Sequence, residues 1–136
     1  MKYQELREKQ QAEFNDFPCF YAFSNGQFEE GLRKLGATKE ELYRGPGGMF
    51  YRKTEGPRLK EMFCRFEQEL LAGFKDDDFL YDAFYYELAN HEYCITLDPE
   101  DAFDALGLSV SEVESDPRML AIYQQARRDY MGNTGE

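Results

Sequence analysis

His91 is the single histidine of this 136-residue chain, and it follows Glu87 by four residues and directly precedes Glu92. On a helix, Glu87 and His91 share one face and could supply two metal ligands. A catalytic zinc site needs a third protein ligand, and the sequence has no HExxH motif or cysteine pair to supply it. A metal-dependent hydrolase centred on Glu87, His91 and Glu92 is therefore an alternative, and a hydrogen-bonded core or helix-end histidine is the simpler interpretation.

The cysteines offer little chemistry. Cys19, Cys64 and Cys94 are odd in number and widely spaced, which is typical of reduced thiols in an intracellular protein. No neighbouring residue in the sequence would activate any of them as a nucleophile. The residues as a whole favour a protein without enzymatic activity, and we expect no metal or other cofactor.

Acidic residues are concentrated in one stretch. The chain has 16 basic and 27 acidic residues and a formal net charge of −11, yet residues 76–116 contain 13 Asp and Glu and no Lys or Arg. Like charges at such spacing repel each other and lower folding stability. One explanation is a surface that docks on a basic partner. The other is that several of these carboxylates stand at helix starts, where the helix dipole favours them.

The docking hypothesis specifies its contacts. Tyr81, Tyr85 and Tyr86 lie off the apolar stripe of their predicted helix, and exposed tyrosine among carboxylates suits a protein interface. The residues predicted to contact the partner are Asp76, Asp77, Asp78, Tyr81, Asp82, Tyr85, Asp98, Glu100, Asp101 and Asp104.

A smaller basic segment, residues 44–60, surrounds the turn Gly45–Gly48. The turn lacks the lysine-threonine end of a P-loop, so it does not predict a nucleotide site. Basic side chains beside Tyr43, Phe50 and Tyr51 could nevertheless bind RNA or a phosphate, although a tight turn with solvated flanks is the simpler explanation. The residues of this second alternative are Arg44, Arg52, Lys53 and Arg58.

The first half of the chain must position these groups with helices and a small sheet. Residues 2–16 lack Gly and Pro and predict a helix, and the aromatic block 17–23 predicts a strand or extended segment. Ser24 with Gln27 opens a helix that ends at Gly36. The β-prone flanks of Gly45–Gly48 predict a hairpin, and the apolar period after Pro57 predicts a helix to about residue 75.

The second half predicts further helices. One runs over about 79–92, and residues 93–97 are expected to form a short strand or extended link. Asp98-Pro99, Ser109 with Glu112, and Asp116-Pro117 each predict a helix start, the last helix reaching about Met131. The expected fold is α+β and mostly α, with six or seven helices and a short sheet around the glycine turn. Residues 1–131 are predicted to form a single domain and residues 132–136 a disordered tail.

Composition excludes several classes of protein. Hydrophobic residues make up 42% of the chain and aromatic residues 16%, too many for a disordered acidic tail. No apolar run approaches the roughly 18 residues of a membrane-spanning helix, and the N-terminus is charged where a signal peptide would be apolar. The net charge argues against direct binding of duplex DNA. We therefore expect a cytoplasmic protein; homodimerisation stays open.

Three segments carry a resemblance: Phe17–Ser24, Gln27–Gly31 and Asn90–Tyr93. They resemble small uncharacterised proteins carried by phages and integrative elements of Firmicutes. In being small, acidic and free of enzyme motifs, the chain is also similar in style to the anti-CRISPR and anti-restriction proteins of such mobile elements. The resemblance implies a non-enzymatic inhibitor or regulator that binds a basic nucleic-acid-handling protein, such as a Cas effector nuclease. It assigns no catalytic residue.

Overall fold

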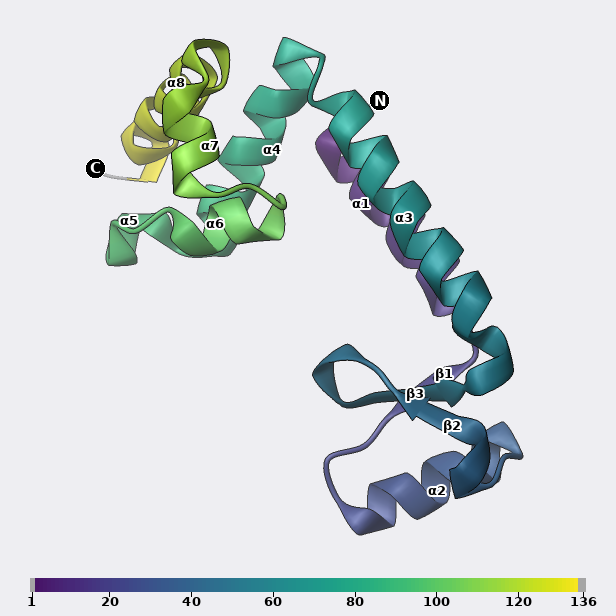
Figure 1. Ribbon diagram of the computed structural model, residues 1–136. Helices are drawn as coiled ribbons and strands as arrows, with labels where there is room; N and C mark the ends of the chain where they lie inside the picture. Colours follow the sequence, from purple (N-terminus) through teal and green to yellow (C-terminus); the bar gives the residue numbers. More distant parts are fainter. Residues whose placement is uncertain (1, 135–136) are drawn as a thin grey trace. The chain divides into compact units, whose positions relative to one another are not determined.

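Helices account for most of the chain in the structure, a computed structural model that describes residues 2–134. The fold is mostly helical α+β, as predicted. Residues 2–134 contain eight α-helices, five of them of seven residues or more, and a three-stranded antiparallel sheet (Figure 1). The eighth helix, beyond the six or seven expected, arises because residues 93–96 form a helical turn.

The chain packs into two compact units. Residues 2–9 and 68–134 form the first, and residues 10–67 form the second. Residues 2–9 and 68–134 hold seven Lys and Arg against 17 Asp and Glu, whereas residues 10–67 hold nine of each. We call the first the acidic unit and the second the neutral unit. The single domain expected for residues 1–131 stays a prediction.

Helices α1 (Tyr3–Asn15) and α3 (Gly56–Gly73) contribute residues to both units. In the acidic unit, α1 buries Tyr3 and Leu6. In the neutral unit, the guanidinium of Arg65 on α3 donates a 3.0 Å hydrogen bond to Glu13 of α1. The narrow buried stripe of α1 matches the few apolar residues in its sequence.

The neutral unit is built on the sheet. Strands β1 (Cys19–Tyr21) and β2 (Leu42–Arg44) pair antiparallel with the two edges of β3 (Met49–Arg52), in register Phe20 with Phe50 and Tyr43 with Tyr51. Helix α2 (Asn25–Leu35) begins after the predicted Ser24 cap and ends at Gly36, whose φ of 72° is the left-handed geometry that glycine adopts without strain. Short 3-10 turns at 39–41, 46–48 and 53–55 connect these elements.

The acidic unit is a bundle centred on α4 (Asp77–Asn90), which packs along α8 (Pro117–Thr134). Between them in sequence lie three short helices, α5 (Tyr93–Thr96), α6 (Glu100–Ala105) and α7 (Val110–Ser115). In Figure 1, α6 crosses below α4 and α7 leads back up to α8. The core includes the fully buried Phe84. The ring centroids of Phe103 and Tyr123 lie 5.8 and 5.4 Å from the centroid of the Phe84 ring.

Three expected boundaries change in the acidic unit. Residues 93–96 are helical rather than extended, because Glu92 and Leu97 adopt left-handed backbone (φ 53° and 57°) and close a single turn. Pro99, not Asp98, is the N-cap residue of α6. Helix α8 continues through Thr134, past the predicted end at Met131. Residues 135 and 136 of the predicted tail lie outside the described residues.

No helix among residues 2–134 is long and apolar enough to cross a membrane.

Candidate binding site

The first group of predicted contact residues stands at the start of α4. The carboxylate of Asp76 accepts hydrogen bonds from the backbone N–H groups of Asp78 and Phe79, so it caps the helix. The Asp77 carboxylate accepts a 2.7 Å hydrogen bond from the guanidinium of Arg118, at the start of α8. All three acids are exposed; Asp76 and Asp77 have a local structural role, and the Asp78 side chain has no partner among the described residues.

The second group follows the end of α4. Asp98 accepts a hydrogen bond from the backbone N–H of Glu100 and so orders the start of α6. Glu100, Asp101 and Asp104 are exposed, and their carboxylates make no hydrogen bond or ion pair with the described residues. With Asp78, these three carboxylates are the predicted contacts most available to a partner. We call Asp98, Glu100, Asp101 and Asp104 the α6 acidic group.

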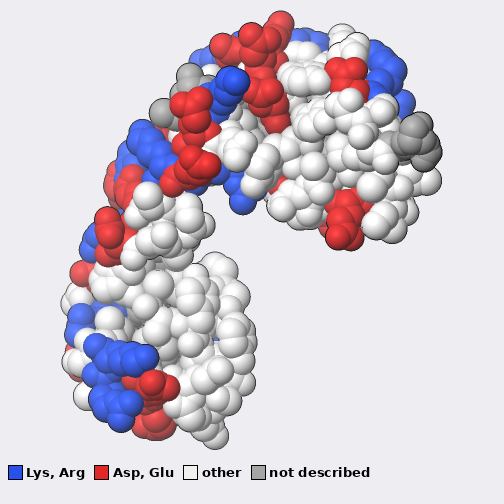
Figure 2. Space-filling view, turned by 180° about the vertical axis from the view of Figure 1, so that it is seen from behind, with Lys and Arg blue, Asp and Glu red and all other residues white. Residues whose placement is uncertain are grey.

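The structure does not bring the two groups together. Helix α4 has 14 residues, which corresponds to a length of about 20 Å. Asp76–Asp78 are at its N-terminal end, whereas α6 packs past its midpoint, where the Phe103 ring meets Phe84. Figure 2 likewise shows the acidic side chains in separate groups with other residues between them. The two groups are therefore separate along α4, and the docking surface made of all ten residues stays a prediction.

The predicted tyrosine anchors are half-buried, not freely exposed. The hydroxyl of Tyr81 donates a 2.6 Å hydrogen bond to Asp129 of α8, and this bond raises the pKa of Tyr81 to about 12. The hydroxyl of Tyr85 accepts a hydrogen bond from Asn133 at 2.8 Å, and its ring meets Tyr130 edge-on. Both rings pack against the core because α8 covers that face of α4. The sequence placed them off the apolar stripe and could not show that a second helix lies there.

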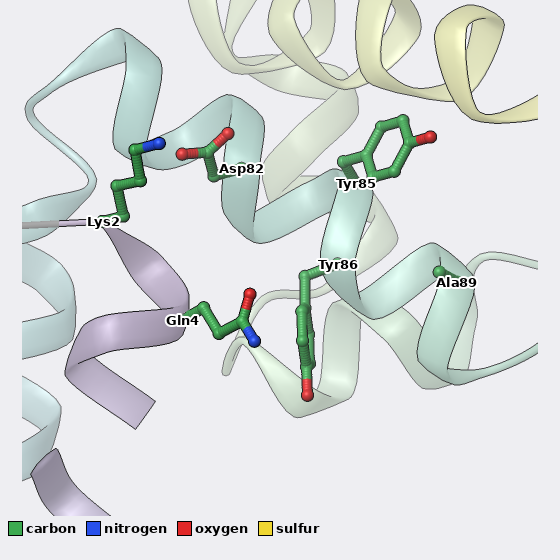
Figure 3. Close-up of a pocket in the computed structure, with 6 residues that line it drawn as sticks. All are labelled: Lys2, Gln4, Asp82, Tyr85, Tyr86 and Ala89. Carbon is green, nitrogen blue, oxygen red and sulfur yellow. The ribbon is translucent and has the colours of Figure 1, made fainter. Parts of the chain in front are cut away.

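A pocket is lined by two of the predicted contact residues, Asp82 and Tyr85, together with residues that were not predicted as contacts. Asp82 and Tyr85 of α4 line it with Tyr86 and Ala89, and Lys2 and Gln4 close the other side. Its volume is about 350 Å³. Figure 3 shows the Tyr86 ring and the Gln4 amide facing the same space, with the ammonium of Lys2 directed toward Asp82, while Tyr85 points away toward α8. Lys2 and Gln4 are 80 and 78 residues from Asp82, so no local pattern predicts this pocket.

Beside this pocket lies a buried carboxylate, that of Glu87. The hydroxyl of Tyr3 donates to its Oε2, and the guanidinium of Arg7 pairs with the same oxygen at 2.5 Å. The amide of Asn90 donates to Oε1 at 3.3 Å. Burial and the Glu87 carboxylate raise the pKa of Tyr3 above its ordinary value. Tyr3 and Arg7 are four apart on α1, so this network fixes the start of α1 on α4.

The network leaves little room for metal chemistry. His91 Nε2 lies 3.4 Å from Glu87 Oε1 and makes no hydrogen bond with the described residues. Glu92 is exposed in left-handed backbone after the end of α4. Among residues 2–134, no three His, Cys, Asp or Glu side chains come close enough together to hold a metal ion. Glu87 is instead a buried carboxylate paired with the partly exposed guanidinium of Arg7, a role that the sequence did not predict.

Of the four basic residues proposed to bind RNA or a phosphate, most contact other residues of the neutral unit. Arg52 donates to the carbonyls of Leu35 and Gly36, at 2.5 and 3.4 Å, and so satisfies the end of α2. Lys53 lies over the Tyr43 ring, and Arg58 pairs with Glu55 and lies over the Phe17 ring. Arg44 alone of the four makes no such contact with the described residues. These contacts explain the basic side chains without a nucleic acid.

The chain belongs to a family of unknown function (DUF7659), whose profile matches residues 2–129. The match covers parts of both units, including α1 and α4 with the pocket between them. No curated protein and no solved structure matches the chain significantly.

Proposed function

We propose that this protein is a non-enzymatic inhibitor or regulator that binds a basic nucleic-acid-handling protein through its acidic unit. The observation that carries the proposal is the segregation of charge. Seven basic and 17 acidic residues lie in the acidic unit, while the neutral unit has nine of each. A unit with that imbalance attracts basic surfaces over a distance and speeds their association.

The α6 acidic group is the part of the acidic unit best suited to the contact. Glu100, Asp101 and Asp104 are exposed on one short helix and have no internal partners among the described residues. Carboxylates without internal partners lose no existing ion pair when they meet a basic surface. Asp76 and Asp77, by contrast, cap α4 and pair with Arg118, so a partner would compete with the fold for them.

The partner class follows from the charge. Proteins that bind nucleic acid carry basic grooves, and carboxylates at helical spacing can occupy such a groove in place of phosphates. The resemblance to proteins of mobile elements in Firmicutes favours a defence nuclease, such as a Cas effector, as the partner. Inhibition would then arise because the acidic unit and the nucleic acid compete for one groove.

The test compares two fourfold charge reversals. In one variant, Asp98, Glu100, Asp101 and Asp104 are changed to Lys; in the matched control, the exposed neutral-unit residues Asp16, Glu29, Glu40 and Glu67 are changed to Lys. Tagged protein is used to capture a nuclease, and binding of the purified nuclease is then measured by calorimetry. We expect the α6 variant to bind at least about tenfold more weakly, and the control to bind nearly as the wild type does.

Circular dichroism establishes that both variants are folded. Equal weakening by both variants would show a response to net charge alone, and would contradict a docking site on α6. Nuclease binding that is unchanged in the α6 variant would contradict the proposal outright. Addition of a short nucleic acid ligand of the nuclease should displace the wild-type protein, because both occupy the same basic groove.

A further inference from the structure

We infer that the pocket between α1 and α4 is a receptor for an arginine side chain presented by the protein's binding partner. The lining contains one carboxylate, Asp82, one aromatic ring that faces the space, Tyr86, and one amide, Gln4. These are the groups that recognise a guanidinium: a counter-ion, a π face and a hydrogen-bond acceptor. The inference rests on the proposed function for the source of the arginine.

Asp82 provides the charge for this recognition. Its side chain is half-buried, and it makes no hydrogen bond or ion pair with the described residues. Two other carboxylates of α4 have partners, since Asp77 pairs with Arg118 and Glu87 with Arg7, while Asp78 is unpaired but exposed. Partial burial strengthens the attraction of a carboxylate for a cation, because less water screens it. An incoming cation would therefore find Asp82 unpaired and less screened than the fully exposed acids.

Tyr86 provides the aromatic surface at the correct place. Asp82 and Tyr86 are four residues apart on α4, so both project from the same face of the helix. The ring already interacts with one guanidinium, that of Arg7, whose central carbon lies 4.9 Å from the ring centroid. Arg7 is neutralised by Glu87 at 2.5 Å, so its charge repels a second cation only weakly. This ring is therefore suited to cation–π contact.

The pocket has room for the end of a side chain. A volume of about 350 Å³ is at the lower end of the range for small-molecule pockets, roughly 300–1,000 Å³. Tyr85 contributes its stem to the wall, and its hydroxyl is held by Asn133 on α8. Gln4 lies opposite on α1, where its amide oxygen can accept a guanidinium N–H.

Lys2 is the internal competitor. It is exposed, lines the same pocket, and directs its ammonium toward Asp82 without reaching ion-pair distance. A Lys ammonium is strongly hydrated and does not stack on a ring as a guanidinium does, so arginine should displace it. Removal of Lys2 should therefore strengthen binding, whereas removal of Asp82 should weaken it.

The direct test uses a free probe and needs no partner. N-acetyl-L-arginine amide is titrated into the isotope-labelled full-length protein, and backbone NMR shifts of Tyr86 and Ala89 are followed. The matched control probe is N-acetyl-L-citrulline amide, which has nearly the same shape and no charge. We expect saturable shifts with the arginine probe only, about fivefold weaker affinity in Asp82→Asn, and tighter binding in Lys2→Met. Tyr86→Leu should also weaken binding, and Tyr86→Phe, which keeps the ring, should not.

Three results would overturn the inference: no binding of the arginine probe, equal shifts with the citrulline and arginine probes, or undiminished arginine binding in Asp82→Asn. These results are independent of the nuclease experiment. If the arginine probe binds as expected and the α6 charge reversal leaves nuclease binding unchanged, the pocket stands and the α6 docking proposal fails. If nuclease binding requires α6 but the probe does not bind the pocket, the docking proposal stands and the arginine receptor is wrong.

Discussion

The acidic and neutral units bury their aromatic residues in different ways. In the acidic unit, Phe84, Phe103 and Tyr123 form an edge-to-face cluster with almost no solvent exposure, inside a continuous core of helical side chains. In the neutral unit, the buried apolar cluster is small: Phe17, Met49, Leu59 and Met62. Other rings there are half-buried, such as those of Phe20 on β1 and Phe50 on β3, which stack on each other.

This difference explains where the charge can be carried. Repulsion among 17 acidic side chains opposes compaction of the acidic unit, and its larger apolar core offsets that cost. The neutral unit has a smaller buried core and balanced charge. A unit with unpaired surface charge of one sign needs a core that offsets the repulsion.

The largest expected effect comes from the core of the acidic unit. Phe84→Ala should lower the free energy of unfolding by about 3–5 kcal/mol, because it leaves a cavity between α4, α6 and α8. The matched change in the neutral unit is Phe23→Ala, at a ring that is 76% exposed, and it should alter stability by less than about 0.5 kcal/mol. Urea unfolding measures both. Similar losses in the two variants would contradict the view that burial of the Phe84 ring is what stabilises the acidic unit.

The buried carboxylate should have the next largest effect. Glu87→Gln leaves the Arg7 guanidinium without its counter-ion, and we expect a loss of about 2–3 kcal/mol in urea unfolding. Glu92→Gln, at an exposed neighbour, is the control and should change stability by less than about 0.5 kcal/mol. If Glu87→Gln were harmless, the network of Tyr3, Arg7 and Asn90 would not hold α1 on α4.

In the neutral unit, close packing of α2 on the sheet can be tested with two glycines of one helix. A Cβ at Gly31 would come within 2.2–2.5 Å of the Phe20 ring, whereas a Cβ at Gly26 would meet nothing within 4 Å. Gly31→Ala should therefore destabilise the protein by about 1–3 kcal/mol through overpacking. Gly26→Ala should be neutral or slightly stabilising, because alanine favours the helix. Thermal unfolding of both variants distinguishes these outcomes.

The Tyr81–Asp129 hydrogen bond predicts a pH dependence confined to alkaline solution. The pKa of Tyr81 is raised from 10.0 to about 12, so the folded state binds the phenolic proton more tightly than the unfolded state. Its contribution is therefore complete below pH 10.0 and is lost as the pH rises toward about 12. Tyr81→Phe should reduce this alkaline loss of stability, by less than about 1 kcal/mol because the phenol is half-exposed. An identical alkaline profile in the variant would contradict it.

The smallest effect concerns the surface charge itself. The double change Asp101→Asn and Asp104→Asn should stabilise the protein by about 0.5 kcal/mol at low salt, because it relieves repulsion in the acidic unit. Glu29→Gln with Glu40→Gln in the neutral unit should have no such effect. The gain should disappear at high salt. A gain that persists there would have a cause other than charge repulsion.

Local signals predicted most of the secondary structure. Ser24, Gly36, the Ser109–Glu112 capping box and Asp116-Pro117 all mark real helix boundaries, because caps act through backbone groups a few residues away. The hairpin around Gly45–Gly48 was predictable for the same reason. The error at residues 93–97 arose because β-branched composition suggests extension, while the sheet that could pair such a segment belongs to the neutral unit.

The candidate site was predictable only in part. The exposed carboxylates of α6 could be named from charge density alone, and Asp82 and Tyr85 do line the pocket. Glu87 and His91 were correctly placed together at helical spacing, and their distance is 3.4 Å. Their interpretation as metal ligands could not anticipate Arg7 and Tyr3, since contacts across 80 residues leave no local trace in one sequence.

The sequence by itself determined the helices, the hairpin and the acidic stretch, because propensity, capping and charge are properties of neighbouring residues. Only the tertiary structure decided which charges stay available. Packing of α8 on α4 holds Tyr81 and Tyr85, and packing of α1 on α4 neutralises Glu87 and leaves Asp82 unpaired in a pocket. These pairings depend on which side chains, distant in sequence, come into contact when apolar surface is buried. Burial of apolar surface involves the whole fold, so a local stretch of sequence does not reveal them.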